Sequence, residues 1–154
     1  MNVQQFLDKH HAVYDVLMHP AAFNAQRIAH SVHVPGERMA KTVLLKADKG
    51  FKYVMAVLPA THQVDLALVK QVIGAGEIEL ASEVDVAAHC VDCEVGAMPP
   101  FGSQMCIETL VDECLAHEVE IVFEGNTHSE AIRMKYRDYY ELEHPLVAQI
   151  SRPD

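Results

Sequence analysis

The sequence predicts a single mixed α/β (α+β) domain in which a mostly antiparallel sheet is surrounded by helices. The strongest indication is a hairpin pattern, in which two apolar runs rich in β-branched residues, 40–47 and 51–58, flank the turn residues 48–50. Helical and strand patterns are also interspersed along the chain. The length of 154 residues, without repeats or low-complexity linkers, fits one domain at roughly 100–200 residues per domain.

The elements before the hairpin are predicted from apolar spacing and from breaker residues. Residues 2–10 are expected to form a helix, and residues 14–18 a short strand that ends before a proline. Residues 23–32 are rich in alanine and carry apolar side chains at helical spacing, which predicts a second helix. The dipeptide Pro35-Gly36 then forms a turn.

The segment after the hairpin is expected to contain a helix, a strand and another helix. Residues 65–73 place apolar side chains on one helical face, and the glycine that follows closes this helix. Residues 78–81 fit a strand. Ser82 and Asp85 have the spacing of a capping box, which predicts a helix over 82–90.

The remaining chain begins with an irregular segment. Residues 94–103 contain two prolines and two glycines, which interrupt helices and strand ladders alike. The elements predicted after it are strands over 105–111, 119–124 and 130–135 and a helix over 137–143.

The charge of the chain limits the partners that it can bind. A net charge of −10 argues against a general nucleic-acid binder, because phosphate contacts need a basic surface. The charges are unevenly distributed, however. Residues 1–70 hold eight basic and five acidic residues, whereas residues 71–132 hold thirteen acids and no lysine or arginine. This asymmetry allows one basic edge on an acidic body.

The composition, with 50% apolar and 22% charged residues, is typical of a soluble globular domain. No apolar run reaches the roughly 18–20 residues that cross a bilayer, and the N-terminus lacks the apolar region of a secretory signal. We therefore expect a cytoplasmic protein with no membrane partner.

The cysteines do not form a recognisable metal site. Cys90 and Cys93 have C-x-x-C spacing, but Cys106 and Cys114 supply no second pair of that kind. The pair is expected near the end of a helix, where the helix dipole raises a thiol pKa. We expect four reduced cysteines, as is usual in the cytosol. A structural or incidental role is favoured, with zinc binding and redox chemistry as the alternatives.

Other cofactor motifs are missing or incomplete. His30 and His33 could share a helical face, but the ten histidines include no H-E-x-x-H motif. The segment 74–76 lacks the third glycine of a dinucleotide fingerprint, and neither G-x-S-x-G nor a phosphate-binding P-loop is present. The sequence therefore predicts no cofactor and no metal.

Two features remain as candidates for chemistry. Lys41 interrupts an apolar strand and is either a gatekeeper of an edge strand or a functional cation in a cleft. The second is the segment 96–102, where glycine lets the backbone approach a ligand and prolines hold it rigid. The N–H groups of Ala97 and Met98 would then be free to donate to an oxyanion or carbonyl, and an ordinary surface turn is the alternative.

These two features belong to a series of motifs through which the sequence resembles the YbaK-like family of aminoacyl-tRNA deacylases, which is related to the editing domain inserted in bacterial prolyl-tRNA synthetases. The motifs, in order, are AKTVLLKA, VMAVLPATHQVDL, ELASEVDV, GAMPPFG and EGNTHSEAIRMKYRDY. The resemblance spans about residues 13–143, most of the chain. Each motif is weak alone, but their order and spacing together are fairly specific.

The resemblance implies a mixed-sheet domain that hydrolyses the ester between an amino acid and the 3′-terminal ribose of a mischarged tRNA. In the family, water attacks with the help of a ribose hydroxyl of the substrate, and no side chain is the nucleophile. Backbone amides of the glycine–proline loop hold the aminoacyl carbonyl. The resemblance thereby assigns Gly96, Ala97 and Met98, together with Lys41, to catalysis.

The resemblance also implies a set of substrate-binding residues. Lys41 matches the family lysine that anchors the terminal phosphate and ribose, a task that suits a strand-borne point charge. His128 falls where alanine-specific relatives carry a pocket histidine. The substrate-binding residues expected in this way are Thr42, Lys46, Pro100 and His128.

A basic patch around Lys41, Lys46 and Lys52 is expected to hold the CCA end of the tRNA, with weak and salt-sensitive binding overall. Recruitment to tRNA then needs an aminoacyl-tRNA synthetase or an elongation factor as partner. The amino acid stays open among alanine, cysteine, proline and serine. The alternative functions are a non-catalytic module for an aminoacyl or nucleotide ligand and a Cys/His zinc protein.

Overall fold

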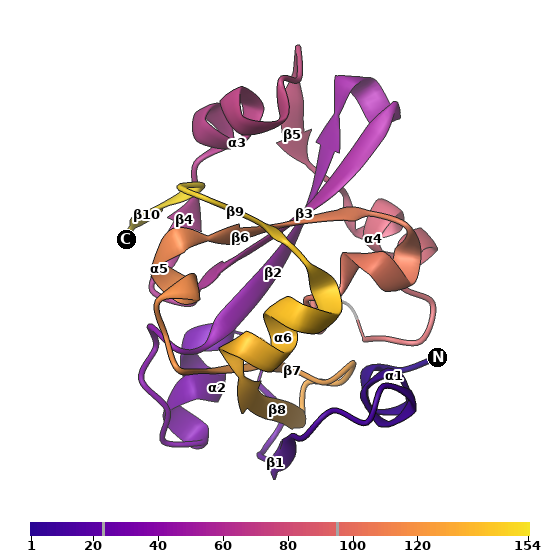
Figure 1. Ribbon diagram of the computed structural model, residues 1–154. Coiled ribbons are helices and arrows are strands. Elements are labelled where there is room, and N and C mark those ends of the chain that lie inside the picture. The colour runs from indigo at the N-terminus through magenta and orange to yellow at the C-terminus, as the bar shows by residue number, and fades with distance from the viewer. Residues whose placement is uncertain (23, 95) are drawn as a thin grey trace.

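A computed structural model describes residues 1–22, 24–94 and 96–154. These residues form a mixed α/β fold, as predicted, around a five-stranded sheet of order β5-β2-β3-β6-β9 (Figure 1). A three-stranded sheet, β1-β8-β7, and a two-stranded sheet, β10-β4, complete the described strands. None of the helices in the described part of the chain is long and apolar enough to cross a membrane.

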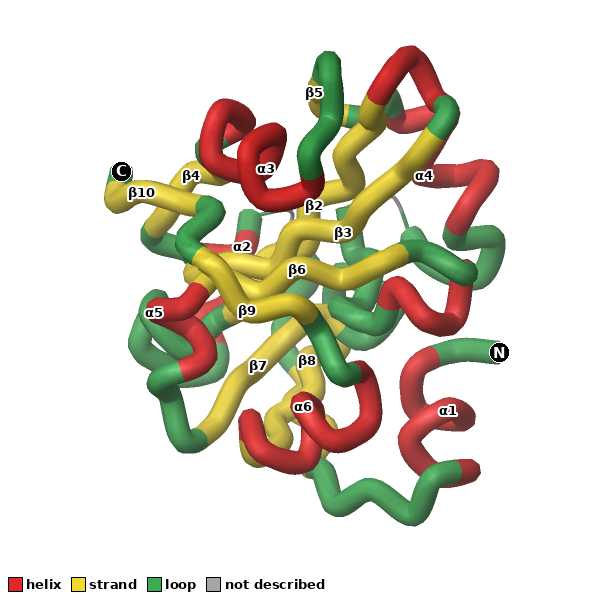
Figure 2. Tube along the Cα trace, turned by 45° about the horizontal axis from the view of Figure 1, so that its top comes forward, coloured by secondary structure: helices red, strands yellow, loops and turns green. Residues whose placement is uncertain are grey.

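The elements follow the chain in the order that Figures 1 and 2 show. The helices are α1 (Val3–Lys9), α2 (Ala25–Ser31), α3 (Leu66–Ile73), α4 (Glu83–His89), α5 (Glu113–Ala116) and α6 (Tyr136–Glu143), with 3₁₀ turns at Asp48–Gly50 and Gly102–Met105. The strands are β1 (Asp15–Met18), β2 (Ala40–Ala47), β3 (Lys52–Pro59), β4 (His62–Val64), β5 (Ile78–Leu80), β6 (Glu108–Asp112), β7 (Glu120–Glu124), β8 (Glu130–Lys135), β9 (Leu146–Ala148) and β10 (Ser151–Pro153).

The hairpin on which the predicted fold class was based is confirmed. Strands β2 and β3 pair antiparallel along their whole length, with Lys41 opposite Leu58 and Lys46 opposite Tyr53. The turn between them places Asp48 and Lys49 at positive φ, a conformation that aspartate tolerates better than most residues. The sheet is mixed because β6 runs parallel to both β3 and β9.

The two larger sheets meet at the start of β2. Met39 forms an isolated parallel bridge with Val122 of β7, and the Val122 N–H donates to the Arg38 carbonyl over 3.0 Å. The first residues of β2 therefore lie beside the end of β7. Figure 1 shows α2, β7 and β8 at this end of β2, whereas α3, β5 and the hairpin tip lie at the other end.

The predicted helix boundaries were largely correct where capping residues are present. Ser82 caps α4 and makes the reciprocal bonds of a capping box with Asp85. Gly74 closes α3 in the left-handed conformation. The predicted helix over 23–32 corresponds to α2, and Phe23 lies outside the described residues.

Two predictions about the second half of the chain were wrong. The strand expected over 105–111 begins only at Glu108, because a 3₁₀ turn takes up the preceding residues. The four cysteines are not all reduced: Cys90 and Cys93 form a disulfide, since the chain after α4 brings their Cα atoms to 5.8 Å, within the usual range for such bonds. Cys106 and Cys114 are free and exposed.

Candidate active site

A small cavity lies where the start of β2, the N-terminal end of α2 and the segment after residue 95 meet the end of β7. Its volume is about 110 Å³, and the residues that line it are Ala25, Ala40, Lys41, Thr42, Gly96, Met98 and Glu124. Four of the residues predicted from the sequence, Lys41, Thr42, Gly96 and Met98, are thus brought to one place, although more than fifty residues separate the two pairs in the chain.

Lys41 supplies the positive charge of this cavity. Its side chain is half-buried, and no carboxylate of the described residues lies within salt-bridge distance of its ammonium. Burial lowers the pKa of Lys41, and the Asp154 carboxylate partly opposes that shift. An anion that enters the cavity would stabilise the ammonium form, so the position suits a phosphate-binding lysine.

Two residues of the segment 96–98, Gly96 and Met98, line the same cavity. Gly96 has a φ of 84°, in the left-handed region that favours glycine, and a Cβ atom there would lie 3.4 Å from His128 Cε1. The Met98 N–H has no acceptor among the described residues. A backbone N–H of this kind is a candidate donor to the carbonyl oxygen of a ligand.

The prediction that the Ala97 N–H is also free was wrong. This N–H donates to the Glu94 carbonyl over 3.0 Å, because the chain turns tightly at the glycine between them. Ala97 is fully buried and does not line the cavity. Its bond to Glu94 closes the turn that precedes Met98.

Glu94, Pro100 and Phe101 are anchored to the rest of the fold by hydrogen bonds and by core packing. The Glu94 N–H donates to the Asn126 carbonyl over 2.7 Å, and the Tyr139 hydroxyl donates to the Pro100 carbonyl over 2.7 Å. Phe101 is fully buried, with its ring centroid 5.1 Å from that of Tyr139. Pro100, which the sequence placed among the substrate-binding residues, is buried and is not among the residues that line the cavity.

His128 lies next to the cavity without lining it. Its side chain is buried, and Nδ1 lies 3.6 Å from Oε2 of Glu124. Together with the close approach to Gly96, this places His128 between the backbone of the 96–98 segment and the end of β7. A substitution of His128 would affect the cavity indirectly, through its contacts with Gly96 and Glu124.

Glu124 is a functional candidate that the sequence prediction missed. It is only 8% exposed, and burial together with the nearby Glu94 carboxylate raises its pKa to about 8. In the sequence it ends an apolar strand just before Gly125, where a carboxylate usually marks a solvated strand end. Glu124 is buried where β7 meets the start of β2. A contact between two sheets cannot be predicted from a local sequence pattern.

Lys46 and Lys52 are not brought to Lys41. They lie near the hairpin tip, where Lys46 pairs with Asp85 at 3.9 Å and Lys52 pairs with Glu108 at 3.1 Å. Lys46 is five residues along β2 from Lys41, about 16 Å at 3.3 Å per residue, and an odd separation places the two side chains on opposite faces of the strand. The three lysines therefore do not form one basic patch.

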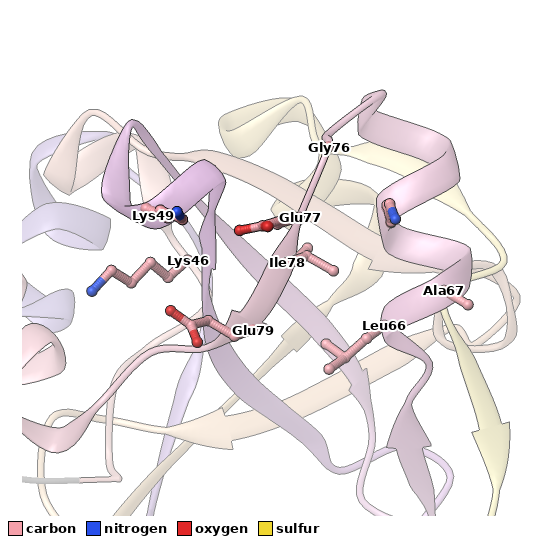
Figure 3. A pocket seen from close by; sticks show the side chains of 9 residues that line it. Lys46, Lys49, Leu66, Ala67, Gly76, Glu77, Ile78 and Glu79 are labelled. Atoms are coloured by element: carbon pink, nitrogen blue, oxygen red, sulfur yellow. The ribbon is translucent and has the colours of Figure 1, made fainter.

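Lys46 instead lines a larger, open groove of about 660 Å³ between the hairpin tip, α3 and β5 (Figure 3). The side chain of Lys46 points away from Leu66 in this view. The groove carries both signs of charge, because Lys49 and Lys70 line it together with Glu77 and Glu79. It holds no buried polar group of the kind found in the Lys41 cavity.

Metal-ligating side chains gather at one place among the described residues. His62, Asp112 and Cys114 each bring one ligand atom within 4.8 Å of the others, on β4, the end of β6 and α5. Both Asp112 oxygens already accept backbone N–H groups, those of Ile150 and Cys114. None of the three lines the Lys41 cavity. The suggested His30–His33 face does not form, because α2 ends before His33.

The raised pKa of Glu124 makes the stability of the fold dependent on pH. The folded state keeps a proton on this carboxyl up to about pH 8, whereas the unfolded chain loses it near the ordinary value of 4.5. Stability from this group is therefore complete below pH 4.5 and is lost as pH rises towards 8, with a slope of roughly 1.4 kcal/mol per pH unit.

Glu124→Gln is expected to remove this slope, so that the variant gains stability over the parent between pH 5 and pH 8 by a few kcal/mol. Urea unfolding at several pH values measures the difference, with the neighbouring Glu94 left unchanged. The control is Glu108→Gln, which changes an exposed carboxylate that pairs with Lys52. A difference between parent and Glu124→Gln that does not vary with pH would contradict the burial of this carboxyl.

Comparison with known families places the fold and cavity in context. The sequence model of the aminoacyl-tRNA editing domain matches residues 19–142, which include every residue of the Lys41 cavity. The chain belongs to the aminoacyl-tRNA editing domain family. The resemblance inferred from the motifs is thereby confirmed.

Proline–tRNA ligases are among the sequence relatives of this editing domain. It is 31% identical over 91 residues to the enzyme of Bacillus cereus strain AH187, and 30% identical over 91 residues to that of Bacillus cytotoxicus. The aligned segment covers 59% of this chain and only 16% of each ligase. The editing domain thus corresponds to a small part of these relatives.

Solved structures confirm the fold. A candidate trans-editing enzyme for prolyl tRNA synthetase superposes with a TM-score of 0.85 at 21% identity, covering 97% of this chain and 94% of that one. A hypothetical protein superposes with a TM-score of 0.88 at 18% identity, covering 97% and 99%. At such identities the likeness shows that this editing domain shares their fold.

Proposed function

We propose that this editing domain is a trans-editing deacylase, which hydrolyses the ester that links a small amino acid to the 3′-terminal ribose of a mischarged tRNA. The observation that carries the proposal is the shared cavity. Lys41, at the start of β2, lines the same 110 Å³ space as Gly96 and Met98. The Met98 N–H has no acceptor among the described residues. A cation for the terminal phosphate or ribose and an amide for the carbonyl are both needed to hold an aminoacylated adenosine.

The reaction that suits this site needs no side-chain nucleophile. Water adds to the ester carbonyl carbon and gives up its proton through a ribose hydroxyl of the substrate. The Met98 N–H stabilises the developing oxyanion, as preorganised backbone amides do in acyl transfer. The bond from the carbonyl carbon to the ribose oxygen then breaks, and the products are a free amino acid and a tRNA with a free ribose hydroxyl. Lys41 holds the terminal nucleotide in place.

The volume of the cavity supports a small amino acid. A space of 110 Å³ corresponds to about four waters at roughly 30 Å³ each. It fits the head of an alanyl, cysteinyl, prolyl or seryl ester, with the adenosine outside. Ala25, Ala40 and Met98 give it apolar walls. Discrimination among these amino acids in an apolar pocket is worth about 1–3 kcal/mol, so we expect a graded preference.

The charge distribution supports weak binding of the protein to the tRNA beyond its aminoacylated end. Lys46 and Lys52 are paired with carboxylates away from the cavity, and the whole chain carries a net charge of −10. We propose that an aminoacyl-tRNA synthetase or an elongation factor delivers the charged tRNA in the cytoplasm. Binding of uncharged tRNA alone is expected to be weak and to fall steeply with salt.

A deacylation panel tests the function. Purified protein is mixed with tRNAs charged with alanine, cysteine, proline or serine, and with a bulky control such as phenylalanine. We expect release of at least one small amino acid well above the spontaneous rate, and none of phenylalanine. No release from any tRNA, together with thermal stabilisation by an aminoacyl-adenosine analogue, would favour a non-catalytic binding module instead.

A further inference from the structure

Glu124 is the acidic member of the Lys41 cavity. It lies two residues beyond Val122 on β7, and Lys41 lies two residues beyond Met39, so the parallel bridge between Met39 and Val122 places the two charged residues side by side. The Glu124 side chain is 9% exposed, and its Oε2 has no hydrogen-bond partner among the described residues. A buried carboxyl oxygen without a hydrogen bond is costly, because the group has lost its hydration.

The remaining polar groups of the cavity do not satisfy this carboxyl. The Lys41 ammonium is beyond salt-bridge distance of it, and His128 Nδ1 approaches Oε2 only to 3.6 Å. The other lining residues, apart from Thr42, offer alanine, glycine or methionine side chains. The cavity thus presents a buried carboxyl whose Oε2 makes no hydrogen bond among the described residues, beside the side chains of Lys41 and Thr42. A bound cation with several N–H donors would supply what is missing.

An aminoacyl ester carries such a cation. Its α-ammonium group lies one carbon away from the carbonyl, so a carbonyl held at the Met98 N–H brings the ammonium to the wall of the same small space. We propose that Glu124 recognises the α-amino group of the aminoacyl moiety, an inference that rests on the proposed function. The cavity then selects esters with a free α-amino group over α-hydroxy esters and N-blocked esters.

The electrostatics of the cavity agree with this assignment. Burial and the Glu94 carboxylate raise the pKa of Glu124, so the empty cavity avoids an uncompensated buried negative charge. An ammonium at the same place favours the ionised carboxylate and forms a desolvated, charge-assisted pair. Lys41, on the neighbouring strand, remains available for the phosphate or ribose oxygens.

A binding experiment separates this inference from catalysis. The probe is adenosine 5′-phosphate that carries L-alanine on its ribose through a 3′-amide, which cannot be hydrolysed as an ester. The matched probe carries L-lactate in the same linkage, so that a hydroxyl replaces the ammonium. By isothermal titration calorimetry, we expect the parent protein to bind the alanyl probe at least about tenfold more tightly than the lactyl probe.

Glu124→Gln is expected to reduce this preference to less than about twofold, because the amide keeps the shape and loses the charge. Glu108→Gln, a surface carboxylate changed in the same way, should keep the full preference. Equal binding of the two probes by the parent protein, or an unchanged preference in Glu124→Gln, would overturn the inference.

The same probes distinguish a failure of the proposed function from a failure of the inference. Preference for the alanyl probe without hydrolysis of charged tRNA would leave the inference standing and refute the deacylase. Hydrolysis of alanyl-tRNA and lactyl-tRNA in the ratio of their spontaneous rates would refute the role of Glu124 and leave the deacylase standing. Absence of binding by both probes would overturn both.

Discussion

Lys41→Ala is expected to lower kcat/KM for release of the amino acid by about 10²- to 10³-fold. The half-buried ammonium has no protein carboxylate within salt-bridge distance among the described residues, so its interaction with the terminal nucleotide is not shared with a structural ion pair. Removing one partner of a partly desolvated charge pair typically costs about 2–5 kcal/mol, which corresponds to losses of this size. Single-turnover deacylation of the preferred charged tRNA measures the effect.

Two variants show whether the loss comes from this charge. Lys41→Arg keeps the charge with a different geometry and should recover only part of the activity. Lys70→Ala removes a lysine from the open groove near α3 and should leave activity within about twofold. Full activity in Lys41→Ala, with normal folding by circular dichroism, would exclude Lys41 from the mechanism.

Phe101→Ala is expected to lower the free energy of unfolding by about 3–5 kcal/mol, the usual cost of removing a buried aromatic side chain. The Phe101 ring is fully buried among Phe6, Phe123 and Tyr139, with centroid distances of 5.1–5.7 Å. It also anchors the segment that carries the Met98 N–H, so deacylation should fall with stability. Urea unfolding at pH 6 and deacylation at low temperature measure the two effects.

Tyr139→Phe is the matched variant for this anchor. It keeps the aromatic packing and removes only the hydroxyl that donates to the Pro100 carbonyl. The expected loss is about 1–3 kcal/mol, because the buried carbonyl is left without this donor. If Phe101→Ala were destabilised by less than 1 kcal/mol, the segment would not depend on the core in the way described.

Much of the fold could be predicted because local patterns determine it. Strands β2 and β8 have the predicted boundaries, since each has a centre of apolar and β-branched residues. The caps of α3 and α4 are set by Gly74 and Ser82. The three-residue strands β4, β9 and β10 were missed, because so short a segment has no periodicity and becomes a strand only through its long-range partner.

The candidate site was predictable only in part. Lys41 and the 96–98 segment stand out because a lysine in an apolar strand and a Gly–Pro loop are locally unusual. The bond from the Ala97 N–H to Glu94 and the separation of Lys46 from Lys41 depend on the turn and on strand geometry. Glu124 could not be found, because its burial arises from the contact between two sheets.

The crystal structure of the protein with the alanyl probe tests the central claim most directly, because the claim concerns where one acylated adenosine lies. We expect the amide carbonyl within hydrogen-bond distance of the Met98 N–H, the 5′-phosphate or ribose at the Lys41 ammonium, and the alanyl methyl against Ala25 and Ala40. A probe bound in the open groove beside Lys49 and Lys70, with the Lys41 cavity empty, would contradict the account.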